Sequence, residues 1–145
     1  MNMPEYISKE EVQRVCQELG LSDWTGLTGG PISLEEAKII QDVVGSEASR
    51  IPTADFKLGL EVELEHGTQF PDANVTNNHP ILTGRIVLAH LKEMLDYYQR
   101  LEVAELEGDL LKAFRSGDRD KLYKKYQLLL QSRADLVGKE STTPD

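Results

Sequence analysis

The sequence predicts an all-α fold, a small irregular bundle of about five to six helices with one long polar loop. Apolar residues recur at intervals of three and four along most of the 145 residues, which is the spacing of one helical face. No segment alternates apolar and polar residues with the β-branched enrichment typical of strands. Glycines and prolines divide the chain into helical lengths, so the all-α class is favoured over mixed folds.

The first two predicted helices are bounded by the same local signals. Ser8 and Ser33 are each followed three residues later by a glutamate, which is the capping-box pattern of a helix N-terminus. Gly20 and Gly45 follow the last residues with helical periodicity and are expected to end the two helices. Trp24, the only tryptophan, lies in the connection between them and is expected to fill the core.

Two longer helices are predicted on either side of the polar loop. A third helix is capped near Thr53 and is expected to stop at Gly67. Residues 68–80 are rich in asparagine and proline and form the long loop. Thr83 is then expected to cap a helix that continues to about residue 105.

Asp118 is predicted to cap a last helix that carries an apolar stripe. The stripe either closes the bundle or docks a protein partner or a second copy of the chain. Its candidate partner-binding residues are Leu122, Tyr126, Leu129 and Leu130.

Two reciprocal motifs carry the candidate site. Glu63 and His66 form Glu-x-x-His in the third helix, whereas His90 and Glu93 form His-x-x-Glu in the fourth. Residues three apart lie on one helical face, so antiparallel packing would bring His66 level with His90 and Glu63 level with Glu93. We expect Gly59 to permit close approach of the neighbouring helix. We expect Tyr97 to contact the cluster as a hydrogen-bond partner of its histidines without being a ligand itself.

The same four residues fit three interpretations. Two imidazoles and two carboxylates are suitable ligands for Zn²⁺, Fe²⁺ or Mn²⁺, and Glu-x-x-His is the device used in di-iron helical bundles. Alternatively, the histidines are hydrogen-bonded core residues that fix the register of two helices. Acid–base catalysis is the least favoured interpretation, because it needs a substrate pocket and perturbed pKa values that a sequence does not reveal. The neighbouring Glu61 and Glu65 are expected to be solvated.

Composition restricts the partners. The formal net charge is −9, which repels polyanions, so no nucleic-acid partner is expected. No apolar run approaches the 18 residues of a membrane span, and no membrane partner is expected either. The single cysteine, Cys16, fits a reducing compartment, and we expect a cytoplasmic protein.

Several segments together resemble a domain-of-unknown-function family of bacteria and their phages. They are Gly59–Gly67, Asn74–Thr76, Leu82–Ile86, Leu88–Leu91 and Asp96–Tyr98. The resemblance covers about residues 32–103 and implies a small helical domain without an assigned activity, in the cytoplasm of a bacterium or of a phage-infected cell.

The chain departs from the family pattern at two places. Leu95 stands where the family has a proline, which predicts that the long fourth helix is unkinked. Asn78 and His79 replace an acidic pair, which removes negative charge from the long loop.

The domain organisation predicted from the sequence is a single helical domain over residues 1–137. It consists of the family-like core at 32–103 and a helical extension at 104–137, followed by a disordered tail at 138–145. The sequence favours two functions for this domain. The first is divalent-metal binding through the four-residue cluster. The second is a non-enzymatic interaction protein or accessory protein, in which the cluster is structural.

Overall fold

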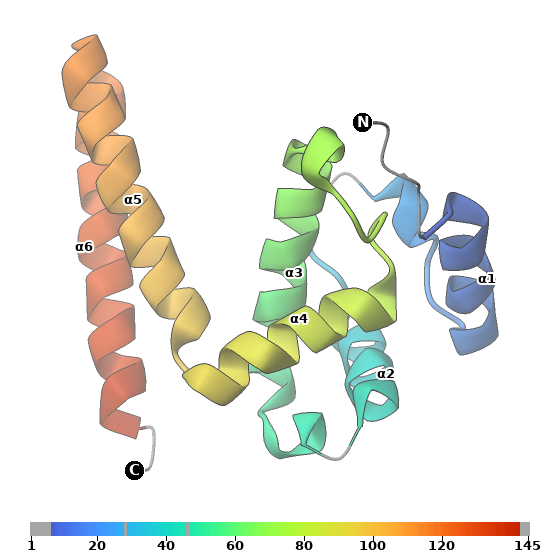
Figure 1. Ribbon diagram of the computed structural model, residues 1–145. Helices are drawn as coiled ribbons and strands as arrows, with labels where there is room; N and C mark the ends of the chain where they lie inside the picture. The colour runs from blue at the N-terminus through green and yellow to red at the C-terminus, as the bar shows by residue number, and fades with distance from the viewer. Residues whose placement is uncertain (1–6, 28, 46, 143–145) are drawn as a thin grey trace. The chain divides into compact units, whose positions relative to one another are not determined.

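The computed structural model describes residues 7–27, 29–45 and 47–142, and over these residues it contains helices and no strands (Figure 1). The predicted all-α class is confirmed, with six α-helices and three short 3-10 helices in the described part. In chain order they are α1 (Lys9–Leu19), η1 (Trp24–Gly26), α2 (Leu34–Val44), η2 (Ala48–Arg50), α3 (Thr53–Gln69), η3 (Pro71–Ala73), α4 (Pro80–Glu93), α5 (Tyr97–Ser116) and α6 (Arg119–Thr142).

The chain divides into two compact units, Met1–Glu93 (unit 1) and Met94–Asp145 (unit 2). Their charges differ. The sequence of unit 1 contains fifteen acidic and seven basic side chains, which gives −8, whereas unit 2 contains ten acidic and nine basic side chains, which gives −1. Almost all of the net charge of −9 therefore belongs to unit 1.

The predicted caps of α1 and α2 are present. The Ser8 hydroxyl accepts a hydrogen bond from the Glu11 amide at 3.2 Å, and the Ser33 hydroxyl accepts one from the Glu36 amide at 3.0 Å. Gly20 ends α1 in the left-handed region, with φ of 68°, where a residue without a Cβ is favoured. These ends are set by local sequence, as the capping patterns predicted.

The core of unit 1 is formed where α2, α3 and α4 pack together, and η1 adds the side chain of Trp24 to it. Trp24 is fully buried, as the sequence predicted. The other large buried apolar side chains of this core are Val12, Ile40, Phe56, Leu60, Leu64 and Val87. Burial of side chains of this size contributes roughly 1.5–3 kcal/mol each, which makes this cluster the main source of stability in unit 1.

A buried amide joins α2 to the segment that leads into α3. The Gln41 side chain is 1% exposed and donates to the carbonyl oxygens of Ala48 and Ile51, both at 2.8 Å. Its own oxygen accepts from the Thr53 hydroxyl, also at 2.8 Å. Thr53 therefore serves Gln41, and the N-cap of α3 is Pro52, which makes no side-chain capping bond. Because every polar atom of the amide is satisfied, its burial is compatible with a stable core.

Helix α4 approaches α2 and α3 most closely at Gly84. A Cβ at this position would lie 2.9 Å from Cγ2 of Ile40, 2.9 Å from Cγ2 of Val44 and 3.3 Å from the Phe56 ring. The first two distances are too short for a real side chain, so the packing of α4 requires glycine here. This contact fixes how α4 crosses the other two helices.

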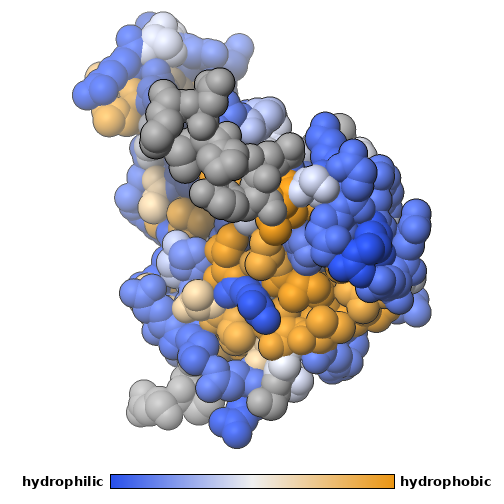
Figure 2. All heavy atoms as spheres, turned by 45° about the vertical axis from the view of Figure 1, so that its right-hand side comes forward, coloured by the Kyte–Doolittle hydropathy of each residue, from blue (hydrophilic) through white to orange (hydrophobic). Residues whose placement is uncertain are grey.

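Part of the apolar content of unit 1 remains at the surface. Leu34 and Val43 of α2 are 55% and 49% exposed. Figure 2 shows apolar side chains gathered on the side of unit 1 that comes forward in this view, with hydrophilic residues around them. Incomplete coverage of this kind is usual in a domain built from short helices.

The prediction of one long fourth helix is wrong. Helix α4 ends at Glu93, and α5 begins at Tyr97 after a turn in which the Tyr97 amide bonds to the Met94 carbonyl at 3.1 Å. A proline is therefore not needed to break the helix. The carboxylate of Asp96 instead precedes α5 and accepts two hydrogen bonds, at 3.0 and 2.7 Å, from Arg100 one turn later.

Other boundaries also differ from the predictions. Helix α3 passes through Gly67 to Gln69, and α6 runs to Thr142, through residues predicted as a disordered tail. Residues 143–145 of that tail lie outside the described part of the chain. Gly108 lies inside α5, in agreement with one of the two alternatives that the sequence left open for this glycine. An isolated glycine weakens a helix by about 1 kcal/mol, which neighbouring turns and packing outweigh.

Unit 2 is an antiparallel hairpin of α5 and α6. Gly117 ends α5 with φ of 71°, and the Asp118 carboxylate accepts from the Lys121 amide at 2.9 Å, as predicted for a cap of α6. Two ion pairs link the helices, Asp109 with Lys125 at 2.7 Å and Glu107 with Arg133 at 2.8 Å. The side chains that fill the seam are buried or half-buried: Leu106, Leu110, Ala113, Leu122, Leu129 and Leu136.

We expect Gly84→Ala and Gly108→Ala to change stability in opposite directions. A methyl group at position 84 must displace Ile40 and Val44, at a cost of about 1–3 kcal/mol. Nothing lies within 4 Å of a Cβ at position 108, so the helix propensity of alanine should stabilise α5 by about 1 kcal/mol. Urea unfolding of both variants, followed by circular dichroism, measures the difference. Equal effects of the two substitutions would contradict the close contact at Gly84.

Candidate functional site

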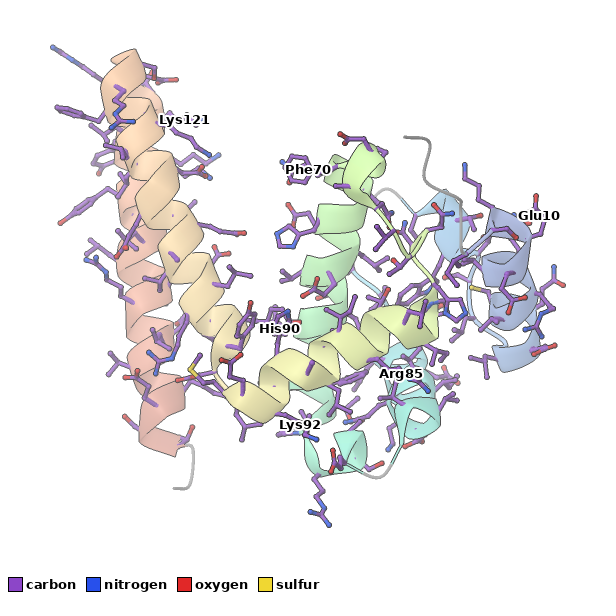
Figure 3. The ribbon with its side chains drawn as sticks, in the orientation of Figure 1. Glu10, Phe70, Arg85, His90, Lys92 and Lys121 are labelled. Carbon is purple, nitrogen blue, oxygen red and sulfur yellow. The ribbon has the colours of Figure 1, made fainter. Side chains whose placement is uncertain are left out.

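The candidate site lies where one face of α3 meets one face of α4. Glu63 and His66 are three residues apart and share a face of α3, and Phe70 follows directly after the end of this helix. Thr83, Ile86 and His90 share a face of α4 by the same spacing, and the two helices pack against each other. Figure 3 shows Phe70 at the C-terminal end of α3 and His90 on α4, on the same side of α3.

One pair of the predicted cluster meets across the two helices. Nε2 of His90 lies 3.6 Å from Oε1 of Glu63, and the two side chains are 32% and 17% exposed. At this distance the two side chains form an ion pair when the imidazole is protonated. Glu63 is therefore a largely buried carboxylate with an imidazole beside it, and the pair ties α3 to α4.

The predicted convergence of all four residues is not formed. In residues 7–27, 29–45 and 47–142, no three His, Cys, Asp or Glu side chains are placed to hold a metal ion together. Helix α4 crosses α3 instead of running antiparallel along it (Figure 1), and His90 lies beside Glu63. Glu93 ends α4 and is exposed. A pair is fewer than the three or four protein ligands of most zinc sites.

The two residues predicted to support the cluster have different positions. Gly59 is buried in α3, one turn before Glu63. Tyr97 begins α5 and belongs to unit 2, where its ring packs edge-on against Tyr98 with centroids 5.1 Å apart.

A small cavity of about 200 Å³ opens beside this pair, and we call it the α3–α4 trough. Its floor and walls come from both helices and from the loop that joins them. The lining residues are Glu63, His66, Gly67, Phe70, Ala73, Asn74, Val75, Thr76, Thr83 and Ile86. The trough thus combines a carboxylate and an imidazole with an apolar end.

The polar loop between α3 and α4 is held down by asparagines. The Asn74 amide donates to the Gly67 carbonyl at 3.0 Å and to Oδ1 of Asn78 at 2.8 Å. Asn77 and Asn78 adopt positive φ values of 47° and 61°, a conformation that asparagine tolerates better than most residues. The loop packs so tightly over α3 that a Cβ at Gly67 would lie 2.5 Å from Oδ1 of Asn78. It forms one wall of the trough and one wall of a larger open cavity of about 530 Å³ beside η1.

His79 lies directly before α4 and caps this helix. Its Nδ1 accepts hydrogen bonds from the amides of Ile81 and Leu82 at 3.2 and 3.4 Å. Burial lowers the pKa of His79 from its ordinary value of 6.5, and Arg14 lowers it further, although Glu11 opposes the shift. Histidine directly before a proline at the first helical position was the available signal, since proline favours that position.

The family comparison covers this site completely. A family model described as Protein of unknown function (DUF5661) matches residues 12–107, about two thirds of the chain. The chain belongs to this family. No curated protein and no solved structure matches it. The DUF5661 match begins earlier and ends slightly later than the resemblance found in the sequence, and it includes α2, α3, α4 and the trough.

The DUF5661 match ends inside α5, so all of α6 lies outside it. The stripe predicted on this helix separates into two faces. Leu129 is 3% exposed and lies with Leu122 in the seam against α5, whereas Tyr126 and Leu130 are 50% and 49% exposed. Half of the predicted stripe therefore closes the hairpin, and the other half faces outward.

Sequence analysis missed further outward residues of the hairpin. Tyr123 and Val137 of α6 are 66% and 60% exposed, and Phe114 of α5 is 72% exposed. The signal was a second helical register, since Tyr123, Tyr126, Leu130 and Val137 follow spacings of three, four and seven.

No helix in the part of the chain that the structure describes is long and apolar enough to cross a membrane.

We expect acid to destabilise unit 1 through His79. Because its pKa is lowered on folding, the stabilisation is complete above the ordinary value of 6.5 and is lost as the pH falls through the lowered value. Protonation of Nδ1 also removes the acceptor for two amides of α4. His79→Asn retains a capping acceptor without a titrating ring, so its urea midpoint should fall less between pH 7.5 and pH 5. Parallel pH profiles for the two proteins would refute this role.

Proposed function

We propose that this protein is a non-enzymatic interaction protein that pairs with a second copy of itself through the α5–α6 hairpin. The observation that carries the proposal is the outward apolar stripe of α6, which we call the α6 stripe. It consists of Tyr123, Tyr126, Leu130 and Val137, each about half or more exposed. Soluble proteins seldom leave a regular row of large apolar side chains in water unless it binds something.

A hollow at the turn end of the hairpin extends the α6 stripe. A cavity of about 340 Å³ is lined by Leu110, Arg119, Leu122, Tyr123 and Tyr126. A second one of about 190 Å³ adjoins it and includes Phe114. Tyrosine, phenylalanine and arginine are the residues that most often anchor protein interfaces, because they bury large areas and retain a polar or charged group.

A second copy is the occupant that unit 2 itself favours. Two antiparallel helices bury one seam and leave their other faces in water, and two such hairpins complete a four-helix bundle. Charge supports this arrangement. Unit 1 carries −8 and would repel its own copy, whereas unit 2 carries −1 and presents almost no such barrier. A two-fold arrangement would place each α6 stripe against the other hairpin.

In this proposal the Glu63–His90 pair has a structural role, which is to join two helices of unit 1. It joins α3 to α4 within the region shared with the family, and it does not form part of a larger group of metal ligands in the described residues. In this proposal, unit 1 is the shared body and α6 is the element that gives this chain its partner.

We expect Leu130→Glu to separate the dimer and Leu128→Glu to leave it intact. The two leucines are 49% and 43% exposed on the same helix, but two residues are about 200° apart on the helical wheel, so only Leu130 lies in the α6 stripe. Sedimentation equilibrium should show a dimer for the wild type and for Leu128→Glu. For Leu130→Glu it should show a dimer dissociation constant raised by about tenfold or more, so that monomer is favoured.

A wild-type monomer at high micromolar concentration would remove the self-association proposal. If Leu128→Glu dissociated as strongly as Leu130→Glu, the loss of the dimer would be caused by the added charge and not by a change in the α6 stripe. Circular dichroism of both variants controls for loss of the hairpin itself.

A further inference from the structure

We propose that the open cavity beside η1 binds a short zwitterionic peptide, whose ammonium pairs with Glu65 and whose carboxylate pairs with Lys9. We call this cavity, of about 530 Å³, the amide-lined cavity. Its lining residues are Lys9, Thr25, Leu27, Glu65, Gly67, Thr68, Gln69, Pro71, Asn74, Asn77 and Asn78. All of them belong to unit 1, so the proposal is independent of the hairpin and of self-association.

Hydrogen bonds and close packing hold the walls of the amide-lined cavity in place. The C-terminal end of α3, the polar loop after it and η1 lie side by side there (Figure 1). The Asn77 side-chain amide donates to the Ile7 carbonyl, which ties the loop to the residues before α1. A Cβ on Gly29 would lie 3.7 Å from the Thr68 hydroxyl, so the segment after η1 lies against α3. Walls that are already fixed lose little conformational entropy when a ligand enters.

The lining is rich in groups that match the peptide bond. Gln69, Asn74, Asn77 and Asn78 carry side-chain amides, which can both donate and accept as a peptide group does. Asn78 is only 8% exposed, and its Oδ1 accepts from the Asn74 amide at 2.8 Å. Within the described residues no hydrogen bond engages Nδ2 of Asn78, although this residue lines the cavity. An almost buried donor of this kind favours a ligand that brings an acceptor, such as a peptide carbonyl.

The cavity presents one charge of each sign, Lys9 and Glu65. Both side chains are exposed, and neither forms an ion pair within residues 7–27, 29–45 and 47–142. A neutral sugar would leave both charges without a counter-charge, and a simple anion or cation would leave one of them so. A molecule with an ammonium at one end and a carboxylate at the other supplies a charged partner to each.

Net charge and volume restrict the ligand further. Unit 1 carries −8 and repels anions, whereas a peptide with free ends and uncharged side chains has no net charge. A water molecule occupies about 30 Å³ of liquid, so a cavity of about 530 Å³ holds roughly eighteen groups of that size. A tripeptide of small residues has about sixteen non-hydrogen atoms and fits this volume.

Trialanine is a suitable probe. We expect it to cause saturable shifts of the backbone amides around the amide-lined cavity in a protein-observed NMR titration at neutral pH. N-acetyl-trialanine lacks the ammonium, and trialanine amide lacks the carboxylate. Each should bind about fivefold more weakly than trialanine, because each loses one ion pair of the kind that exposed groups form. The peptide blocked at both ends should bind more weakly than either.

Two substitutions assign each end of the peptide to its residue. Glu65→Gln should lose about fivefold in affinity for trialanine and become indifferent to acetylation, whereas Lys9→Gln should become indifferent to amidation. The matched controls are Asp72→Asn and Arg85→Gln, which remove one charge of each sign from exposed residues that do not line the cavity. Both controls should leave the affinity for trialanine unchanged within about twofold.

Any of three results overturns the proposal. They are the absence of saturable shifts at millimolar trialanine, equal affinity for the doubly blocked peptide, and an undiminished cost of acetylation in Glu65→Gln. The comparison of free and blocked peptides uses the wild-type protein, so it does not depend on the folding of any variant. Circular dichroism establishes that the substituted proteins are folded.

Discussion

Unit 1 depends on the contact between the backbone of α4 at Gly84 and the side chains of α2 and α3. Ile40, Val44 and Phe56 lie so close that no Cβ fits, and this sets how α4 crosses the helices below it. Gln41 acts in the same region, because its buried amide ties α2 to the segment that enters α3. With both helices fixed, Glu63 and His90 meet at 3.6 Å and the trough opens beside them. The contact between Glu63 and His90 is a consequence of helix packing, and the loop between α3 and α4 adds one wall of the trough.

The two units differ in what they offer to other molecules. Unit 1 concentrates the negative charge and contains the trough, the asparagine-rich loop and the His79 cap. Unit 2 is nearly neutral and exposes aromatic and aliphatic side chains in a regular row. The family match covers unit 1 from residue 12 and stops before α6. A shared body that carries most of the negative charge and a nearly neutral hairpin that extends beyond the family match are compatible with the proposed self-association, since like charge opposes it.

Local features were predictable because they depend on neighbouring residues. The caps at Ser8, Ser33 and Asp118 follow from side-chain hydroxyls and carboxylates that reach amides three residues away. Predictions that required a packing partner were less successful. Glu61 was expected in water, but it accepts a hydrogen bond from the Ile32 amide at 3.0 Å and pairs with Lys57. The prediction of one long helix through Leu95 was wrong, because the chain turns after Glu93 and a new helix begins at Tyr97 without any proline.

The sequence by itself determined the helical class, the positions of most caps, the burial of Trp24 and the presence of two carboxylate–imidazole motifs on separate helices. Only the tertiary structure decided which members of those motifs meet. Periodicity states which residues share a face of one helix, but the angle at which two helices cross depends on the shapes of the side chains between them. Here the missing side chain of Gly84 sets that angle, so His90 meets Glu63 while Glu93 remains exposed.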